Sequence, residues 1–240
     1  MSYVDLHCHI LWDLDDGCRS PDETLLAARS LAAVGYSDAA PTPHVQARYG
    51  GGDAGLSRER LEEARSLLAS EGVELVLHPG GENLLDDGFV ARAGSEARGL
   101  GEGGRYVLVE LPFQAEVPGL PELLALTRAT GVTPILAHPE RCLEFERQGR
   151  AAEAVRLGAA LQLNLGALIG RHGRSARRLA ERFLDEGLYA VAGTDLHSPE
   201  GADEWIAEAL ETLAERAGGA CLRRLCDENP RRALTGADLS

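Results

Sequence analysis

The segment Val4-Asp5-Leu6-His7-Cys8-His9-Ile10-Leu11 decides the fold, because it is an apolar strand that carries two histidines two positions apart. Residues i and i+2 of a strand face the same side, so His7 and His9 are expected to point together. Six further short runs are mostly continuously apolar, as is typical of parallel strands buried on both faces. The predicted strands are 3–10, 36–40, 73–77, 106–111, 133–137, 160–165 and 189–192.

Helical patterns lie between these strands. The first helix begins with the capping box Ser20-Pro21-Asp22-Glu23 and ends at Gly35. The other predicted helices are 57–70, 120–129, 151–157, 175–184, 203–217 and a short one at 222–226. Seven strand–helix units, with no glycine-rich nucleotide loop after the first strand, favour an α/β fold of the (β/α) barrel type over a doubly wound sheet.

Composition excludes several classes of protein. The 240 residues include 24 basic side chains, all of them Arg, against 38 acidic ones, and the net charge of −14 argues against a protein that coats nucleic acid. No apolar run approaches the roughly 18 to 20 residues of a membrane-spanning helix, so no membrane insertion is expected. The beginning of the sequence lacks the basic start and apolar core of a signal peptide, and the five Cys form no Cys-x-x-Cys pair. Reduced thiols and a cytoplasmic location are therefore expected.

Ionisable side chains stand at the ends of six of the seven predicted strands. They are His7 and His9 after the first strand, His44 after the second, Glu82 after the third, Glu110 after the fourth, His138 after the fifth, and Asp195 and His197 after the seventh. The carboxyl ends of barrel strands build the active site, and imidazoles and carboxylates that converge there predict a cluster of metal ions. Nitrogen and oxygen ligands without thiolates suit Zn, Mn or Fe, and a shared carboxylate can bridge two of the ions. The other two histidines, His78 and His172, are interpreted as structural or surface residues, with a supporting role beside the metals as an alternative for His78.

These motifs resemble a known superfamily. The matching residues are His7-x-His9-Ile10-Leu11, Asp15-Asp16-Gly17, His44, Glu82, Glu110, Ala137-His138-Pro139-Glu140-Arg141, Asp195-x-His197 and Asn229-Pro230. Together they resemble the polymerase-and-histidinol-phosphatase (PHP) superfamily, and most closely its bacterial protein-tyrosine phosphatases encoded with capsule and exopolysaccharide synthesis genes. The resemblance covers nearly the whole chain. It implies the PHP fold, a distorted (β/α)7 TIM-like barrel, formed by residues 1–240 as a single domain.

The resemblance also implies three divalent metal ions. The first would be held by His7, His9, Glu82 and Asp195; the second by Glu82, Glu110 and His138; the third by Asp16, His44 and His197. Asp16 is chosen because it directly precedes Gly17, as in the family pattern. The neighbouring Asp13 and Asp15 are then expected to be solvated loop carboxylates.

The implied reaction is hydrolysis of a phosphomonoester by a metal-bridging hydroxide, with Arg141 as a clamp on the phosphate. The alternative for Arg141 is a surface ion pair with Glu140 or Glu144. No cysteine nucleophile is needed, because neither Cys8 nor Cys142 begins the Cys-x5-Arg loop of a thiol-based phosphatase.

The implied substrate is a phosphotyrosine-containing protein, the tail of a tyrosine kinase of polysaccharide synthesis. The related tyrosine phosphatases usually carry a second Arg shortly after the Asp-x-His motif, whereas residues 198–204 of this chain contain none. Arg171 or Arg174 are candidates to replace it. The alternatives are a PHP enzyme that acts on histidinol phosphate, a nucleotide or a phosphodiester, and a non-catalytic, metal-stabilised scaffold.

Overall fold

The computed structural model describes residues 2–46, 48–86 and 88–240, and its strands form two parallel sheets. The strands of the smaller sheet are, in order, β1 (Tyr3–Cys8), β2 (Tyr36–Pro41) and β4 (Val76–Leu77). Those of the larger sheet are, in order, β3 (His44–Val45), β5 (Glu82–Leu84), β6 (Tyr106–Glu110), β7 (Thr133–Leu136), β8 (Ala160–Asn164) and β9 (Tyr189–Gly193). The α/β architecture with parallel strands is thus confirmed.

Each of the seven predicted strands has an observed counterpart, but two short strands were not predicted. Strand β3 follows β2 after Thr42 and Pro43, and β5 follows β4 after a Pro-Gly-Gly turn at 79–81. Proline has no N–H to donate to a neighbouring strand, and glycine weakens a strand because it has no side chain to pack. These residues therefore interrupt what would otherwise be two longer strands. As a result, His44 pairs with Glu82 in register at the start of the larger sheet.

Main-chain hydrogen bonds connect the two sheets. The Asp195 N–H donates to the His7 carbonyl at 2.7 Å, and the His9 N–H donates to the Leu196 carbonyl at 2.8 Å. These bonds place the segment after β9 beside the end of β1. Between β2 and β3, the Pro43 carbonyl accepts the N–H of Glu82, the first residue of β5, at 3.2 Å. The strand ends that carry the predicted site are therefore neighbours at the junctions of the sheets.

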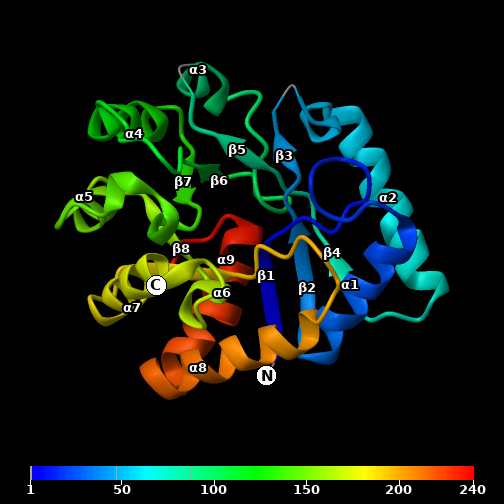
Figure 1. The fold of residues 1–240 in the computed structure, drawn as a ribbon. Helices are drawn as coiled ribbons and strands as arrows, with labels where there is room; N and C mark the ends of the chain where they lie inside the picture. Colours follow the sequence, from blue (N-terminus) through cyan, green and yellow to red (C-terminus); the bar gives the residue numbers. More distant parts are fainter. Residues whose placement is uncertain (1, 47, 87) are drawn as a thin grey trace.

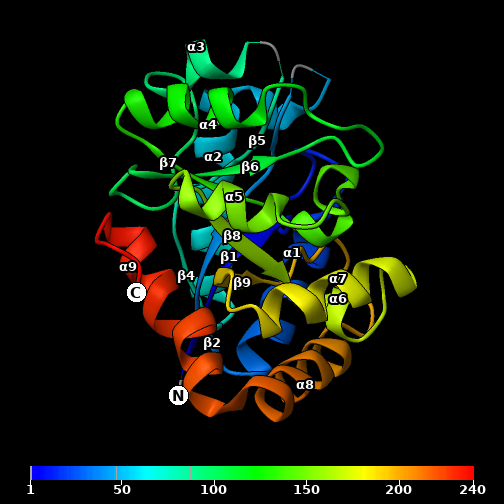
Figure 2. The same ribbon diagram turned by 90° about the vertical axis from the view of Figure 1, so that its left-hand side faces the viewer.

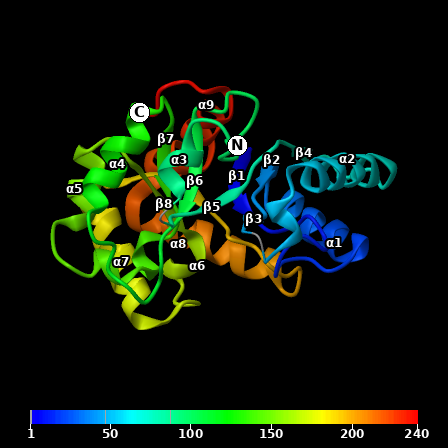
Figure 3. The same ribbon diagram turned by 90° about the horizontal axis from the view of Figure 1, so that it is seen from above.

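Helices surround the strands (Figures 1 and 2). They are α1 (Pro21–Ala33), α2 (Ala54–Ser70), α3 (Phe89–Ala93), α4 (Leu120–Ala129), α5 (Arg150–Arg156), α6 (Leu165–Leu168), α7 (Gly173–Asp185), α8 (Ala202–Arg223) and α9 (Asn229–Thr235), with 3₁₀ turns at Gly50–Gly52, Pro139–Arg141 and Leu143–Phe145. Seen from above, α1 and α2 lie at one end of the molecule, and α4, α5 and α7 lie at the other (Figure 3).

Two details of the helices are informative. Ser20 is confirmed as the N-cap of α1, since the Glu23 N–H donates to its hydroxyl at 3.2 Å. The Glu23 carboxylate accepts the Arg19 N–H at 2.8 Å and not that of Ser20, so the predicted capping box is only half formed. The short helix predicted at 222–226 is wrong in its boundaries: α8 continues to Arg223, a wider helical turn covers Arg224–Glu228, and the terminal helix is α9. The helical pattern is continuous there, so periodicity alone does not separate these segments.

The core has two parts on opposite faces of the strands. Along β6, Tyr106 and Leu108 pack in one cluster with residues of α9, while Val107 and Val109 pack in the other, against the surrounding helices. Burial of both faces explains why the strands read as continuous apolar runs. Glu110 continues the face of Tyr106 and Leu108, so the strand delivers it to the site. Within the described ranges, none of the helices combines the length and apolar character that a bilayer crossing requires.

Candidate metal centre

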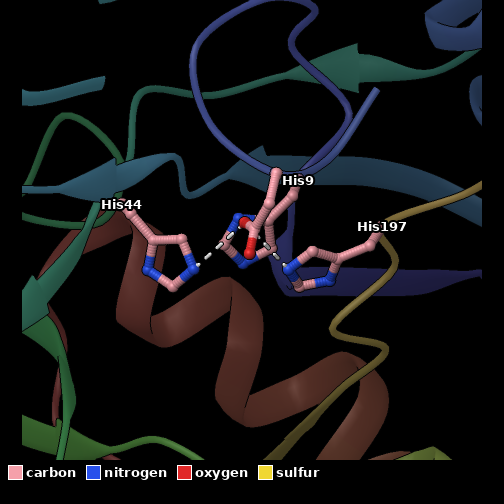
Figure 4. Close-up of side chains that lie close together, drawn as sticks. His9, His44 and His197 are labelled. Carbon is pink, nitrogen blue, oxygen red and sulfur yellow. Dashed lines mark ion pairs between the residues drawn. The ribbon is translucent and has the colours of Figure 1, made fainter. Parts of the chain in front are cut away.

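All nine predicted metal ligands lie in one cluster. Potential ligand atoms within 4.8 Å of one another form four overlapping groups: His9, Asp16, His44 and His197; His7, His9 and Asp195; His7, Glu82 and His138; and His44, Glu82 and Glu110. Figure 4 shows the imidazoles of His44 and His197 on either side of His9. Segments from β1, the end of β9 and the strands between them thus converge on one site.

The groups divide the residues differently from the sets implied by the resemblance. His9 lies with Asp16, His44 and His197 as well as with His7 and Asp195. Glu82 is shared, since its Oε1 lies 3.2 Å from His138 Nε2 and its Oε2 lies 3.1 Å from His44 Nδ1. A buried carboxylate between several imidazoles has the position of a bridging ligand.

Hydrogen bonds orient three of the imidazoles. His7 Nδ1 lies 3.2 Å from Gln162 Oε1, and His9 Nδ1 lies 2.7 Å from Asp15 Oδ2. His197 Nδ1 lies 2.9 Å from the main-chain oxygen of Asp195. When Nδ1–H donates to such an acceptor, Nε2 carries its lone pair into the site, which is the tautomer that binds a metal.

Several buried nitrogen and oxygen atoms of the cluster form no hydrogen bond and are suited to bind a cation. Among the described residues, His44 Nδ1, Glu82 Oε2 and His138 Nδ1 are buried and form no hydrogen bond; the first two lie 3.1 Å apart but without hydrogen-bond geometry. Glu82 and His138 are each only 1% exposed. Buried polar atoms without partners are costly, and a divalent cation would satisfy such nitrogen and oxygen donors. The chemistry of the donor set therefore fits divalent metal ions.

The close packing of charged groups shifts the pKa values of several side chains in the cluster. Burial by itself raises the pKa of Glu82, but His7 and His138 hold it well below its ordinary value. Burial lowers the pKa of His7, yet the carboxylates of Glu82 and Asp195 outweigh this and raise it to about 9. Burial and the neighbouring Glu82 raise the pKa of Glu110 to about 7. This concentration of perturbed groups is typical of a functional site.

The burial of the Asp15 side chain corrects one prediction. Asp15 was expected to be a solvated loop carboxylate, but its side chain is only 1% exposed. Besides His9, it accepts the N–H groups of Gly17 and His44 at 3.0 Å and 2.9 Å. The sequence motif shows two adjacent aspartates, and only the path of the loop decides that Asp15 turns inward. Asp13 is exposed, as predicted.

Three further supporting residues were not predicted as part of the site. Asp5 is fully buried; it accepts the Thr194 hydroxyl at 2.5 Å and the His7 N–H at 3.1 Å. Gln162 accepts from the His138 N–H at 3.0 Å, and the Asn164 amide donates to Asp195 Oδ2 at 2.8 Å. A signal for these two was present, because Gln162 and Asn164 are polar residues two apart in an otherwise apolar strand.

Two of the candidate ligands have a left-handed backbone conformation. The φ angles are 33° at His138 and 55° at Asp195. Non-glycine residues seldom adopt this region, and such strain is often found at functional sites. The Asp195 main chain is held in place by the hydrogen bond to His7 described above, and the His138 N–H is held by Gln162.

Arg141 lies at the edge of the cluster. Its Nη1 donates to Asp195 Oδ2 at 2.6 Å, and its guanidinium carbon lies 4.5 Å from the centre of the Phe113 ring. The alternative of a surface ion pair with Glu140 or Glu144 is wrong. Glu140 accepts from the Asn164 N–H and the Tyr189 hydroxyl, and Glu144 pairs with Arg150.

Neither candidate for a second arginine reaches the cluster. Arg171 lies with its guanidinium carbon 4.7 Å from the centre of the Trp205 ring, and Arg174 is exposed near the start of α7. Within the described part of the chain, neither forms a hydrogen bond or an ion pair with the nine candidate ligands.

The remaining histidines and cysteines behave largely as predicted. His78 Nε2 lies 2.9 Å from Asp38 Oδ1, away from the cluster. His172 Nε2 lies 3.2 Å from Oδ1 of Asn164, whose amide donates to Asp195. Burial raises the pKa of the Cys142 thiol well above its ordinary value, which disfavours a thiolate nucleophile.

Comparison with known proteins agrees with this geometry. Residues 3–235 match the family model "Capsular polysaccharide synthesis, CpsB/CapC". The tyrosine-protein phosphatase YwqE of Bacillus subtilis is 28% identical over 94% of this chain and 89% of its own length. The tyrosine-protein phosphatase CpsB of Streptococcus pneumoniae is 24% identical over 96% of this chain and 98% of its own length.

Solved structures agree as well. A structure from the work on YwqE and CpsB, described as unique metal-dependent tyrosine phosphatases, superposes with a TM-score of 0.90 at 26% identity, covering 99% of this chain and 96% of that one. The phosphotriesterase homology protein of Escherichia coli has a TM-score of 0.63 at 16% identity, over 97% of this chain and 98% of its own, which shows a shared fold alone. The resemblance inferred from the motifs is confirmed, and the chain belongs to the CpsB/CapC family of capsular polysaccharide synthesis proteins.

Proposed function

We propose that this protein is a metal-dependent phosphomonoesterase that removes phosphate from phosphotyrosine in a protein, the tail of a tyrosine kinase of polysaccharide synthesis. The observation that carries the proposal is the convergence of nine imidazole and carboxylate side chains, several with buried donor atoms that lack partners. Membership of the CpsB/CapC family and the names of the relatives support the same activity.

Three divalent ions, Mn, Fe or Zn, are proposed to occupy the cluster. Their proposed ligands are His7, His9, Glu82 and Asp195 for the first, Glu82, Glu110 and His138 for the second, and Asp16, His44 and His197 for the third. Bound divalent cations would neutralise charge on the phosphoryl group and supply a water-derived nucleophile at neutral pH. The chain's own contribution is to hold Nε2 of His7, His9 and His197 toward the cluster through the hydrogen bonds to Gln162, Asp15 and the Asp195 carbonyl.

Arg141 is proposed to bind the phosphate oxygens. Its side chain is 25% exposed, and it presently donates to Asp195. A guanidinium can bind two oxygens of a phosphate at once, so it is suited to orient the ester beside the cluster. The face of Phe113 supports the guanidinium and restricts where it can move.

Phe113 favours an aryl ester. It is 37% exposed, and its ring centre lies 5.2 Å from that of His138. It lines a cavity of about 460 Å³ together with Arg141 and Leu143. The wall of this cavity also carries polar side chains, among them Gln114, Glu146 and His172. The tyrosyl ring of a substrate whose phosphate is bound by Arg141 would pack against Phe113 and Leu143, the large apolar side chains of the wall, and this contact would exclude water from the ester.

Three broader assignments belong to the same proposal. We propose that the two sheets form one distorted (β/α)7 TIM-like barrel, in which β2 with β3 and β4 with β5 each count as one strand. We propose that residues 1–240 form a single domain. Five free thiols, four of them buried, support a reducing compartment such as the cytoplasm.

The test is turnover by the purified protein loaded with Mn²⁺, on three substrates: a phosphotyrosine peptide, histidinol phosphate and a dinucleotide. The expected result is a kcat/KM for the phosphotyrosine peptide that is highest by at least tenfold. A preference for either of the other substrates would identify another phosphoesterase of the superfamily. Lack of turnover on all three, with metal bound, would overturn the enzymatic proposal.

A further inference from the structure

A second cavity lies behind the metal centre, between α2 and the ends of β2 and β4. Its volume is about 230 Å³. Its polar side chains are Ser57, Arg58, His78 and Arg98, and the rest of its wall is apolar side chains, prolines and glycines. Helix α2 lies beside β4 at this side of the molecule (Figure 1). The cavity is therefore separate from the opening beside Arg141.

Arg98 lines this cavity and also a neighbouring one of about 860 Å³ that Asp86 and Glu96 border, and among the described residues one of its guanidinium nitrogens has no hydrogen-bond partner. Its main-chain N–H donates to Asn83 Oδ1 at 3.0 Å, and its carbonyl accepts from Asn83 Nδ2 at 3.0 Å. Its Nη1 donates to the hydroxyl of the buried Ser57 at 2.7 Å. Among the described residues, its Nη2 is buried and has no hydrogen-bond partner. Nearly all buried polar groups in proteins are hydrogen-bonded, so an unpaired, charged donor at a cavity indicates a missing acceptor.

The charge around Arg98 points to the kind of acceptor. Of the described residues, no Asp or Glu lines the cavity, although the chain has 38 acids against 24 Arg. Burial lowers the pKa of Arg98; the Asp53 carboxylate opposes this by raising it, and the Arg58 cation lowers it. Oδ1 of Asp53 accepts the N–H groups of Gly55 and Leu56 at the start of α2, and Asp53 does not line this cavity. Arg98 and Arg58 are thus two cations on a cavity wall without carboxylates, which favours an anion from solution.

We propose that this cavity is a binding site for a tetrahedral oxyanion, either free phosphate or the phosphate group of a small organic phosphoester. The buried Nη2 of Arg98 would turn into the cavity to donate, and Arg58, which is exposed and also lines the cavity, would donate a second hydrogen bond. Arg is the side chain suited to planar, two-pronged recognition of phosphate. The volume exceeds that of one phosphate group, so the apolar wall leaves room for a carbon-containing part.

The position of the cavity connects it to the metal centre. Leu11, Pro43 and Gly80 line it, and each is one or two residues from a proposed metal ligand, His9, His44 or Glu82. An anion bound here would contact the same segments that position those ligands. The site does not depend on the proposed phosphatase activity, because its argument rests on Arg98, Arg58 and the cavity alone.

Crystals of the metal-loaded protein soaked in selenate, a tetrahedral dianion that contains an anomalous scatterer, test the proposal. The expected result is an anomalous peak within hydrogen-bond distance of Arg98 Nη2. Any selenate at the metal centre gives a separate peak, which serves as an internal reference. In Arg98→Met and Arg58→Met crystals, the occupancy of the cavity peak should fall at least fivefold relative to that reference. Arg29→Met, which removes a similar charge from an exposed site on α1, should leave the peak unchanged.

Competition then distinguishes the two sources of the anion. Displacement of selenate by phosphate, but no better by phenylphosphonate, identifies free phosphate as the ligand. Stronger displacement by phenylphosphonate identifies an organic phosphoester group that uses the apolar wall. No cavity peak at saturating selenate, or an undiminished peak in Arg58→Met and in Arg98→Met, would overturn the proposal. If Arg98→Met does not fold, Arg58→Met decides alone.

Discussion

The Nδ1 nitrogen of His9 lies 2.7 Å from the Oδ2 oxygen of Asp15, and Nε2 of the same imidazole faces Glu82 at 3.4 Å. Asp15 thus fixes the orientation of a histidine that belongs to two of the ligand groups. A carboxylate that accepts the second ring N–H also makes the imidazole a more basic ligand. This relationship leads to the first prediction.

Asp15→Ala should lower metal content and reduce kcat/KM by roughly 10- to 100-fold, the usual effect of removing a residue that orients a metal ligand. Asp13→Ala is the matched control, since Asp13 lies in the same loop but is exposed. Elemental analysis of the purified proteins and turnover of an aryl phosphate measure both effects. Equal metal content and equal turnover in the two variants would show that Asp15 does not act through His9.

Removal of the metals should abolish hydrolysis and lower the thermal midpoint. The cluster places Glu82, Glu110 and Asp195 together in a buried site, and without cations their charges repel. Dialysis against a strong chelator, followed by addition of Mn²⁺, should remove and then restore both activity and thermal stability. The same chelator presaturated with Mn²⁺ is the control. Full activity in protein whose metal content has fallen to background would contradict the metal-dependent mechanism.

Phe113→Ala should weaken the preference for aryl esters. The loss of a ring contact corresponds to roughly a 2- to 10-fold rise in KM for an aryl phosphate, with little change for an alkyl phosphate. Leu126→Ala, which truncates an exposed side chain on α4, is the control. Steady-state kinetics of each variant on both esters measure the effect. A parallel change for aryl and alkyl esters would mean that Phe113 acts only by supporting Arg141.

Arg141→Lys should raise KM and lower kcat for every phosphomonoester, because a lysine keeps the charge but loses the two-pronged geometry. The expected loss in kcat/KM is on the order of 100-fold, comparable with the removal of one preorganised oxyanion donor. Arg147→Lys, at an exposed position nearby in sequence, should resemble the unchanged protein. Metal content should stay normal in both variants, and a loss of metal from Arg141→Lys would reassign Arg141 to positioning Asp195.

Asp38 should make stability depend on pH. Burial by itself raises the pKa of Asp38, but hydrogen bonds from His78, Ser37 and Arg231 lower it below its ordinary value. The stability that Asp38 contributes is fully present above the pKa of the unfolded chain, about 4, and is lost as the pH falls through the lower folded-state value.

Asp38→Asn should therefore reduce the free energy of unfolding by roughly 1–2 kcal/mol at neutral pH, and by less in acid. Urea unfolding of both proteins at neutral pH and in acid measures the difference. Glu59→Gln, an exposed change on α2, serves as the control. A difference between Asp38→Asn and the unchanged protein that does not shrink in acid would show that the carboxylate charge is not responsible.

The sequence by itself determined the seven main strands and eight of the nine candidate ligands, because both depend on local patterns; the ninth, Asp16, came from the resemblance to the family. Continuous apolar runs mark buried parallel strands, and ionisable residues at their ends mark the site. The interrupted strands β3 and β5 were not predicted, because pairs and triplets of residues between prolines and glycines carry no readable period.

Only the tertiary structure decided which neighbours support those ligands. Asp15 and Asp16 are adjacent in sequence, yet the loop turns one inward to His9 and leaves the other with a more exposed side chain. Gln162 reaches His7 from 155 positions away, and Arg98 meets Ser57 from 41 positions away. Hydrogen bonds of this kind depend on distances between elements that are far apart in the chain. Local sequence patterns specify strands and ligand types, whereas the orientation of each side chain is set by packing that no local pattern contains.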